Sequence, residues 1–452
     1  MSRRQRPSSE VLVVGAGAAG IAAARMLHEQ GVNVAVIEAR NRIGGRVWTL
    51  HPADAPLPIE LGAEFIHGRA PGLDQLLADA SLTQLDIGGR RFHAGRKQLR
   101  PFDDFWERLD RVMRRLDSSV QPDRSFHDFL ARRPGGRRLA SDRALARRYV
   151  EGFHGADPRL ISASVMAESG SPGNDIQERR LRRVVGGYDR VLAWLAAPIR
   201  GRIRLSSVVT SIQWERGAVS MAIRSRTGGR LRRINARTAI ITIPLGVLQA
   251  PVGSNGAIQF IPELREKRDA LMKLAAGSAL RVVLQFRNGF WTSDQFAKRR
   301  HADDLHAMSF LHSADDDFST VWTTYPVTAP LLVAWSGGRR ARELSSLTRG
   351  AIIERAVDAL ARQMGTARRR LHRELKTAWT HDWENDPYAR GAYSYQVVEG
   401  ATAPSALARP LEGTLFFAGE ATDTSGATGT VHGAIASGRR AASQAMRALG
   451  LG

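Results

Sequence analysis

A glycine-rich turn near the start of the chain has the spacing needed to bind a diphosphate. Gly15, Gly17 and Gly20 follow the short apolar run 11–14, and an alanine-rich helix is expected from 21 to 30. At this spacing the first glycine permits a tight turn, the second lets a diphosphate approach the backbone, and the third lets helix and strand pack closely. The N–H groups and the dipole at the helix start favour the bound anion.

An acidic residue follows at the position where a ribose would be bound. The strand expected from 32 to 37 ends at Glu38. Its carboxylate can accept hydrogen bonds from the ribose hydroxyls, and it disfavours the 2′-phosphate of NADP. The glycine turn alone is weak evidence, but strand, turn, helix and terminal acid together indicate a Rossmann-type dinucleotide-binding domain. NAD and FAD share this pattern, so other segments must distinguish them.

Several further segments carry the distinguishing residues. The segment 38–46 reads E-A-R-N-R-I-G-G-R, and 60–68 reads E-L-G-A-E-F-I-H-G. Near the C-terminus, the segment 415–420 reads as a buried strand that leads into a turn, and a helix is expected from 430 towards Met446. In sequence and order these segments resemble the flavin-containing amine oxidase family, and the motifs are most like those of its polyamine oxidase branch. Three more matches, at 183–190, 207–212 and 242–248, extend the resemblance over almost the whole chain.

The resemblance implies a non-covalently bound FAD. A flavin tethered through a cysteine sulfur is excluded because the chain contains no cysteine. By the same resemblance Val209 contacts the adenine region, Glu420 holds the ribityl chain, and the helix start at Thr430 faces the flavin ring, where its dipole stabilises negative charge. The residues placed against the cofactor are Gly15, Gly17, Ala18, Ala19, Gly20, Glu38, Ala39, Arg40, Gly44, Gly45, Arg46, Leu61, Gly62, Ala63, Glu64, Val209, Trp383, Gly419, Glu420, Thr430 and Val431.

The resemblance also implies an α/β fold with two discontinuous domains. The length of 452 residues exceeds what one hydrophobic core usually holds. We expect a Rossmann-type FAD-binding domain from 1–85, 186–265 and 400–452. A substrate domain of mixed sheet and helices is expected from 86–185 and 266–399.

Four residues are candidates for walls of the substrate site. The stretch 383–395 resembles the "W-x-x-D-P-x-x-x-G-x-Y-S-Y" stretch of the polyamine oxidase branch, in which Tyr393 would form an aromatic wall that orients an amine. Trp383 would lie nearer the reactive edge of the flavin. Thr430 stands where monoamine oxidases have a second aromatic wall, so the cage would be half aromatic. His67 could titrate near neutrality and help to keep the amine neutral, although a structural role is equally open.

A fifth candidate, Arg281, departs from the family pattern. It begins the strand expected at 281–286, where the family usually has a lysine that holds a water against the flavin. Arginine keeps the charge but is a planar fork of donors, so the exchange is not conservative. Oxygen reactivity is therefore open, and the enzyme is an oxidase or a dehydrogenase. Alternatively, Arg281 binds a substrate carboxylate, as in an L-amino-acid oxidase, or is an ordinary strand arginine.

The implied reaction is FAD-dependent oxidation of an amine. A hydride passes from the carbon next to the nitrogen to flavin N5, the imine hydrolyses, and oxygen reoxidises the flavin and gives hydrogen peroxide. One alternative is a flavin enzyme that acts on a carbon–carbon bond, like the desaturases. Another is a non-enzymatic flavoprotein that binds an acidic partner, supported mainly by the net charge of +22.

Composition restricts the other partners. Almost all the positive charge is arginine, in short clusters that are not interleaved with aromatic residues, so nucleic-acid binding is not expected. No apolar stretch is long enough for a transmembrane helix, and the histidines lack metal-ligand spacing. Arg3, Arg4 and Arg6 could suggest an export signal, but cleavage behind them would remove the glycine fingerprint, so a cytoplasmic protein is expected. Nothing in the sequence indicates the oligomeric state.

Overall fold

The structure is a computed structural model that describes residues 10–95, 97–169, 179–314 and 317–451. The N-terminal arginines Arg3, Arg4 and Arg6, considered above as an export signal, lie outside the described residues.

A five-stranded parallel sheet contains the glycine fingerprint. Its strand order is β10-β2-β1-β14-β23. The strands are β1 (Val11–Val14), β2 (Val34–Ile37), β10 (Ile203–Arg204), β14 (Thr238–Ile241) and β23 (Leu415–Phe417). All four pairings are parallel. The strands β1, β2 and β23 are continuous apolar runs, and β14 is apolar after Thr238, because both faces of the sheet are covered. This confirms the predicted Rossmann-type α/β fold.

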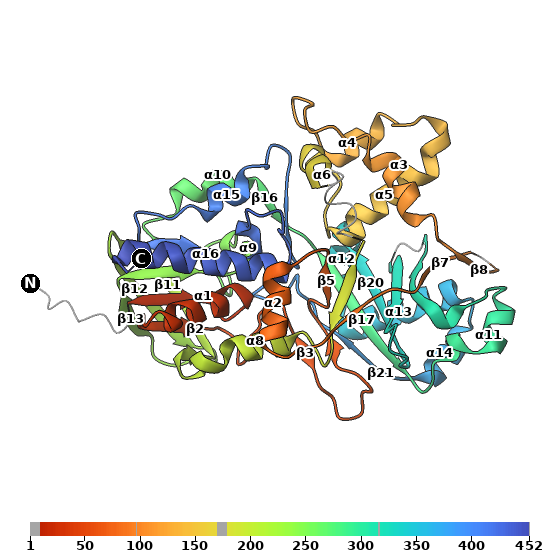
Figure 1. The fold of residues 1–452 in the computed structure, drawn as a ribbon, viewed down its shortest axis with the longest axis horizontal. Helices are drawn as coiled ribbons and strands as arrows, with labels where there is room; N and C mark the ends of the chain where they lie inside the picture. The colour runs from red at the N-terminus through yellow and green to blue at the C-terminus, as the bar shows by residue number, and fades with distance from the viewer. Residues whose placement is uncertain (1–9, 96, 170–178, 315–316, 452) are drawn as a thin grey trace, which may run out of the picture.

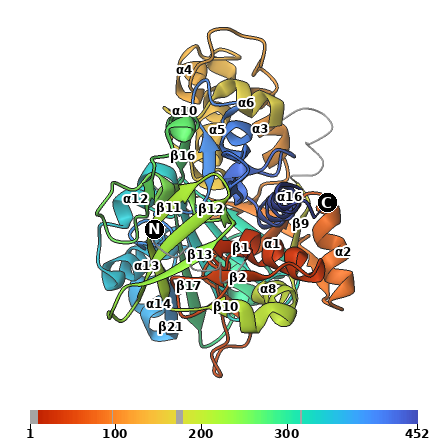
Figure 2. The same cartoon turned by 90° about the vertical axis from the view of Figure 1, so that its left-hand side faces the viewer.

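Helices cover one face of this sheet and a second sheet covers the other. Val11 and Val13 of β1 pack with α1 (Ala18–Glu29) and α16 (Val431–Leu449). Leu12 and Val14 point the other way, into the core beneath the sheet β13-β12-β11-β15. The bounds of its strands are β11 (Ser207–Glu215), β12 (Ala218–Ser225), β13 (Arg232–Ala236) and β15 (Gln259–Ile261). Figure 2 shows this half of the molecule facing the viewer.

Three predicted boundaries shift by a few residues. The fingerprint helix begins at Ala18 rather than Ile21, because Gly17 already has the extended backbone of an N-cap. β2 begins two residues after Val32, since the Val32 N–H still donates to the last turn of α1. The C-terminal helix extends to Leu449, three residues past the predicted end.

A seven-stranded mixed sheet forms the other half of the molecule (Figure 1). Its order is β21-β17-β20-β19-β18-β7-β8, with β18 and β7 parallel and the other neighbours antiparallel. The strands are β7 (Arg90–Ala94), β8 (Leu99–Pro101), β17 (Ala279–Phe286), β18 (Met308–His312), β19 (Thr320–Thr323), β20 (Leu331–Gly337) and β21 (Leu375–Thr380). Leu280, Val282 and Leu284 pack under α13 (Arg349–Met364), so Arg281 points to the opposite face.

A group of helices stands at one end of the molecule, above this sheet in Figure 1. It comprises α3 (Phe105–Met113), α4 (Phe126–Ala131), α5 (Ala140–Phe153) and α6 (Ala163–Ser169). Phe105, Phe126 and Tyr395 share its apolar core. A small sheet of β5 (Phe65–His67), β9 (Leu181–Val184) and β6 (Gln84–Asp86) lies between the two halves.

The remaining elements connect these layers. They are α2 (Pro71–Asp79), α8 (Asp189–Ala196), α9 (Leu245–Leu248), α10 (Arg268–Met272), α11 (Asp294–Arg299), α12 (Gly338–Leu344), α14 (Arg368–Glu374), α15 (Ala403–Ala408), β3 (Thr49–Leu50), β4 (Ile59–Glu60), β16 (Leu274–Ala276) and β22 (Ser394–Gln396). The strands of the two main sheets come from the segments that the sequence assigns to two domains, and the domain boundaries themselves stay a prediction.

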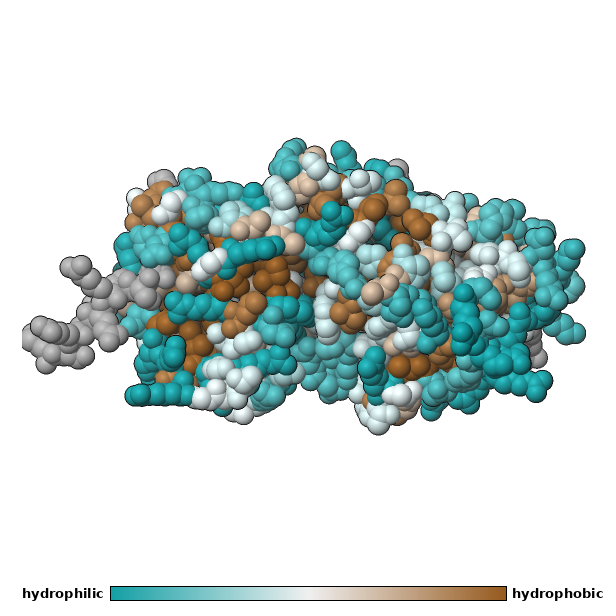
Figure 3. All heavy atoms as spheres, turned by 90° about the horizontal axis from the view of Figure 1, so that it is seen from below, coloured by the Kyte–Doolittle hydropathy of each residue, from teal (hydrophilic) through white to brown (hydrophobic). Residues whose placement is uncertain are grey.

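The surface in one view is mostly hydrophilic. Figure 3 shows hydrophobic residues in separate groups between hydrophilic ones on the face seen from below. Among the described helices, none combines the length and apolar character needed to cross a bilayer. No cluster of histidine and acidic side chains in the described part of the chain could hold a metal ion.

Candidate active site

A cavity of about 1040 Å³ connects the glycine fingerprint with the seven-stranded sheet. Gly15, Glu38 and Val209 line one end, and Arg91 and His312 line the other. All of the predicted cofactor and substrate residues except Gly20 lie on its wall. Residues from the whole length of the chain therefore meet at one site of the size that a dinucleotide and a small molecule need.

The fingerprint glycines fit a bound diphosphate. A Cβ atom at Gly20 would lie 1.9 Å from the carbonyl oxygen of Gly15, so this glycine allows close packing of helix and strand. A Cβ atom at Gly17 would meet no atom within 4 Å, although Gly17 lies on the cavity wall. No side chain caps the start of α1. Gly17 thus leaves open space at an uncapped helix start, where an anion is favoured.

Glu38 organises the loop at this end. One carboxylate oxygen accepts from the Ala16 N–H at 2.7 Å, and the other accepts from the Arg40 N–H at 2.8 Å. Burial raises the pKa of Glu38, although these hydrogen bonds act against the shift. Arg40 in turn donates to Asp386 at 2.7 Å. Glu38 remains positioned for the ribose role, which stays a prediction.

A second carboxylate, that of Glu420 near the C-terminus, connects the segment 38–46 with the stretch 383–395. Glu420 accepts from Nη1 of Arg46 at 2.9 Å, and its other oxygen accepts from the Ser394 hydroxyl at 2.6 Å. Arg46 also donates to the carbonyl of Ala392 at 2.6 Å. These bonds hold the backbone beside Tyr393. Contacts of Arg46 and Glu420 with FAD stay predictions.

Two aromatic residues form a fixed wall of the cavity. The hydroxyl of Tyr393 donates to the carbonyl of Phe153 at 2.7 Å, and the indole of Trp383 donates to the carbonyl of Leu61 at 2.9 Å. Burial raises the pKa of Tyr393, so it stays a neutral phenol. Each ring is therefore held at its polar end while its face remains available to a ligand.

Thr430 is the N-cap of α16. Its hydroxyl accepts from the Gly433 N–H at 3.0 Å and donates to the carbonyl of Ala427 at 2.7 Å. The first turn of the helix, at Val431 and His432, lies on the cavity wall and carries no acidic residue. The positive end of the dipole of α16 therefore faces the cavity.

His67 differs from one expectation. Burial, followed by the nearby rings of His432 and His154, lowers its pKa to about 4. The ring is thus neutral at pH 7, because it is buried between the rings of Phe153 and Phe65 on the cavity wall, and its role towards the amine stays a prediction. Its Nδ1 atom is buried without a hydrogen-bond partner among the described residues, which suits a polar ligand in the cavity.

Arg281 is held by an acidic partner. Its Nη2 lies 3.2 Å from Glu64, and its Nη1 donates to the carbonyl of Glu60 at 2.8 Å. Glu64 also accepts from Arg183 at 2.7 Å and from the indole of Trp322 at 3.1 Å. Arg281 is buried, so it is not an ordinary exposed strand arginine. Its charge is shared with Glu64 while its Nε atom has no hydrogen-bond partner among the described residues, so a role of Arg281 towards oxygen or towards a substrate carboxylate stays a prediction.

The residues in the outer half of the cavity could not be identified from the sequence. Arg91 and His93 of β7 lie there with Trp106 of α3 and with Phe310 and His312 of β18. No motif identified them, because their strands and helix are far apart in the chain. The alternation of β7, whose Phe92 points into the core, is the one local signal that Arg91 and His93 share a face.

The fold and the cavity together define a class of protein in which a dinucleotide-binding domain presents its cofactor to an aromatic pocket in a second domain. The family model described as flavin containing amine oxidoreductase matches residues 18–446. The chain belongs to this family, and it is an FAD-dependent amine oxidoreductase.

Individual relatives cover nearly the whole chain. Polyamine oxidase 2 of Arabidopsis thaliana is 28% identical over 97% of this chain and 88% of its own length. Lysine-specific histone demethylase 2 of Homo sapiens is 27% identical over 97% of this chain and 53% of its own. Among solved structures, wild-type putrescine oxidase bound to putrescine aligns with a TM-score of 0.77 at 20% identity, covering 97% of this chain and 99% of that one. Cyclohexylamine oxidase from Brevibacterium oxydans IH-35A aligns with the same TM-score at 23% identity, over 98% and 100%. These two structures establish the likeness in fold.

Proposed function

We propose that the protein oxidises a carbon–nitrogen bond of an amine in the large cavity and uses oxygen as the electron acceptor. The observation that carries the proposal is that the fingerprint glycines and the candidates Tyr393, Trp383 and Arg281 line one continuous cavity. When bound, FAD supplies the acceptor for a hydride from the carbon next to the nitrogen and passes the electrons to oxygen, which gives hydrogen peroxide. The imine product hydrolyses to a carbonyl compound and releases ammonia from a primary amine or a shorter amine from a substituted one.

The chain's own residues would hold the cofactor at two helix starts. Gly17 and the start of α1 would receive the diphosphate, with Glu38 at the ribose. The start of α16 behind Thr430 would face the flavin ring and stabilise negative charge on it. Trp383 and Tyr393 would stand against the ring, since both line the same cavity as the first turn of α16.

The cavity favours a neutral amine at the reacting position. Burial between aromatic rings disfavours a charged ammonium group. His67 is neutral, and the carboxylate of Glu64 is already bound by Arg183 and Arg281. The substrate would therefore lose its proton on entry, after which no residue needs to act as a strong base.

Arg281 would support the reaction with oxygen. Its guanidinium is buried beside Trp322 and Trp335, at 5.2 and 5.7 Å from the ring centres. Its Nε atom has no hydrogen-bond partner among the described residues. A fixed positive charge with an available donor stabilises the negative charge that develops as oxygen is reduced.

The alternatives receive less support. Each relative named above is, by its name, an amine oxidase or a histone demethylase. This favours an amine over a carbon–carbon bond, and an enzyme over a binding module.

An anaerobic absorbance experiment tests the proposal. The FAD-loaded protein is mixed with alkylamines, polyamines, arylalkylamines and amino acids, and is then opened to air. We expect the flavin bands to bleach with an amine and to return rapidly in air with formation of peroxide. Bleaching with slow return would make the protein a dehydrogenase. No bleaching by any amine would overturn the proposal.

A further inference from the structure

We infer that the outer half of the cavity binds a carboxylate, so that the substrate is an amine with an anionic group at the end remote from the oxidised bond. This inference rests on the proposed function and specifies its substrate class. The inference comes from Arg91 on β7, which has no role in the proposed oxidation of the amine.

Arg91 is a guanidinium in an aromatic pocket. Its central carbon lies 5.5 Å from the ring centre of Phe105, 5.1 Å from that of Trp106 and 5.3 Å from that of Phe310. No described carboxylate forms an ion pair with it, and no hydrogen bond of its side chain is found within the described ranges. Burial lowers the pKa of Arg91 to about 10, so it keeps its charge at pH 7. The group is thus a half-buried, charged fork of donors on the cavity wall.

The contrast with the other buried and half-buried arginines near the cavity is informative. Arg281 and Arg183 share the carboxylate of Glu64, and Arg46 is paired with Glu420. A buried guanidinium normally has such a partner, because an uncompensated charge is costly. At Arg91 the structure provides aromatic faces instead, which stabilise the cation but leave its hydrogen-bond donors unused. A ligand carboxylate would use them bidentately.

The surroundings of Arg91 are positive. Arg148 of α5 lines the same region of the cavity, and the acidic residues lining the substrate half within the described chain are Glu64, already bound by arginines, and Glu168, which is exposed. Burial, followed by nearby arginines, lowers the pKa of His93, and it lowers that of His312 to about 3. The same burial and the same arginines would disfavour a ligand ammonium group. The net charge of +22 acts in the same direction by attracting anions towards the molecule.

The sheet sets the length of the substrate. Arg281 pairs with Trp335 across β17 and β20, and Phe310 pairs with Arg91 across β18 and β7. The strands β17 and β7 are four apart in the sheet, which corresponds to roughly 19 Å at the usual spacing. The aromatic side chains of Trp335, Trp322 and Phe310 cover the sheet between the two arginines. An extended substrate with an apolar middle would therefore place its amine near Arg281 and its carboxylate at Arg91.

A matched series of substrates tests this inference. Decylamine, decane-α,ω-diamine and ω-aminodecanoate have the same chain length and differ only in the far end. We expect kcat/KM for ω-aminodecanoate to exceed that for decylamine by at least about tenfold, as for a hydrogen-bonded charge, with the diamine below both. The Arg91→Gln variant should lose this preference, mainly through KM. A direct titration of the flavin absorbance with decanoate should give a weaker Kd for the variant.

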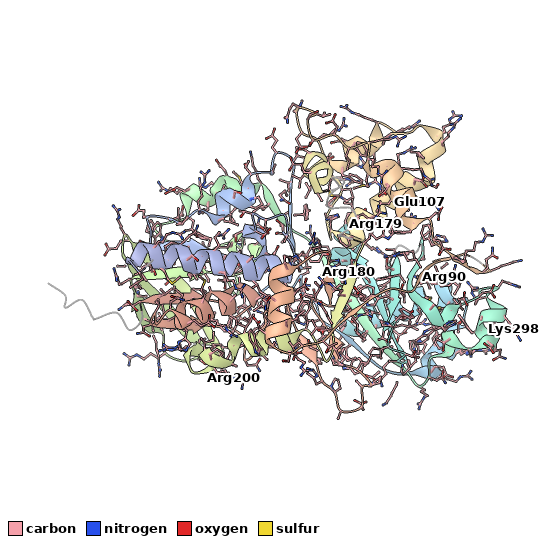
Figure 4. All side chains as sticks on the ribbon, in the orientation of Figure 1. Arg90, Glu107, Arg179, Arg180, Arg200 and Lys298 are labelled. Atoms are coloured by element: carbon pink, nitrogen blue, oxygen red, sulfur yellow. The ribbon has the colours of Figure 1, made fainter. Side chains whose placement is uncertain are left out.

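The control removes the same charge from the other side of the strand. Arg90, labelled in Figure 4, precedes Arg91 on β7. It pairs with Asp103 at 3.1 Å and Asp304 at 3.2 Å, and it is not among the residues that line the cavity. The Arg90→Gln variant should keep the wild-type order of substrates. Oxidation of decylamine without a preference for the carboxylate would overturn this inference and leave the proposed function standing. Failure of every amine in the series and in the panel above would overturn the proposed function itself. If Arg91→Gln does not fold, the ranking by the wild-type protein still decides.

Discussion

Nη2 of Arg281 lies 3.2 Å from Oε2 of Glu64, in a buried ion pair between a strand of the substrate half and the loop under the cofactor cavity. The same carboxylate binds Arg183, which comes from a third segment of the chain. One carboxylate thus pairs with two arginines and joins three segments of the chain at one side of the cavity.

Loss of this carboxylate should destabilise the protein. The Glu64→Gln variant leaves two buried guanidinium groups without their counter-charge, and removal of one partner of a buried pair costs about 3–5 kcal/mol. We expect a lower free energy of unfolding in urea denaturation of the FAD-loaded protein. Glu343→Gln, which removes an exposed partner of Arg339 and Arg340, is the control and should have a smaller effect. Equal effects of the two substitutions would contradict this account of Glu64.

The charge of Arg281 should affect the rate of flavin reoxidation by oxygen more than the rate of flavin reduction by the amine. In stopped-flow measurements, Arg281→Met should slow the return of flavin colour in air by at least about tenfold, because a fixed charge beside the reacting oxygen is lost. Arg281→Lys keeps the charge and should retain most of the rate. The anaerobic bleaching rate with the same amine serves as the internal reference. Equal slowing of bleaching and return would point to general damage instead.

Loss of the Tyr393 ring should lower kcat/KM more than loss of its hydroxyl group alone. Tyr393→Phe loses one hydrogen bond, to the carbonyl of Phe153, which contributes about 1 kcal/mol to folding, but it keeps the ring, so kcat/KM should fall by no more than about fivefold. Tyr393→Ala removes the wall that orients the amine, and misplacement of this kind costs on the order of a hundredfold. FAD content measured by absorbance should stay close to wild type in both. An alanine variant with wild-type turnover would remove Tyr393 from the site.

Two glycines of the fingerprint should respond differently to the same added methyl group. Gly17→Ala places a Cβ in open space on the cavity wall, so we expect a folded protein with at least about tenfold weaker FAD binding, since the methyl blocks the approach of the diphosphate. Gly20→Ala places a Cβ 1.9 Å from a backbone oxygen, so it should lower the unfolding temperature even without FAD. FAD titration and thermal unfolding of the FAD-free protein separate the two effects. Loss of FAD-free stability in both variants would be inconsistent with the open space at Gly17.

Buried histidines should make the protein sensitive to acid. Burial lowers the pKa of His67 and His154 from 6.5 to about 4 and that of His312 to about 3. The unfolded chain therefore binds more protons than the folded one below pH 6.5, so the free energy of unfolding falls from pH 6.5 to about 4, and for His312 to about 3. His312→Gln should flatten this decline, measured by denaturation at several pH values, and the exposed His306→Gln should not. An identical pH dependence in all three proteins would be evidence against the burial of His312.

The sequence alone predicted the parts of the site that depend on local conformation. The strand at 11–14, the glycine turn and Glu38 form one contiguous unit whose backbone geometry follows from neighbouring residues, so their roles could be inferred from the chain itself. The C-terminal strand and the helix that starts after Thr430 were recognised in the same way. The predicted helix start at Ile21 was late because an N-cap glycine carries no side-chain signal.

Only the tertiary structure decided which charges meet. Whether Arg281 faces a ligand or a carboxylate depends on Glu64, which lies on a distant segment, and a pattern along the chain cannot encode that distance. Arg91 is one arginine among many in this sequence, and it became significant only because β7 places it beside β18 and under α3. The physical reason is that burial and pairing decide the role of a charged side chain, and both arise from packing between segments that are remote in the sequence.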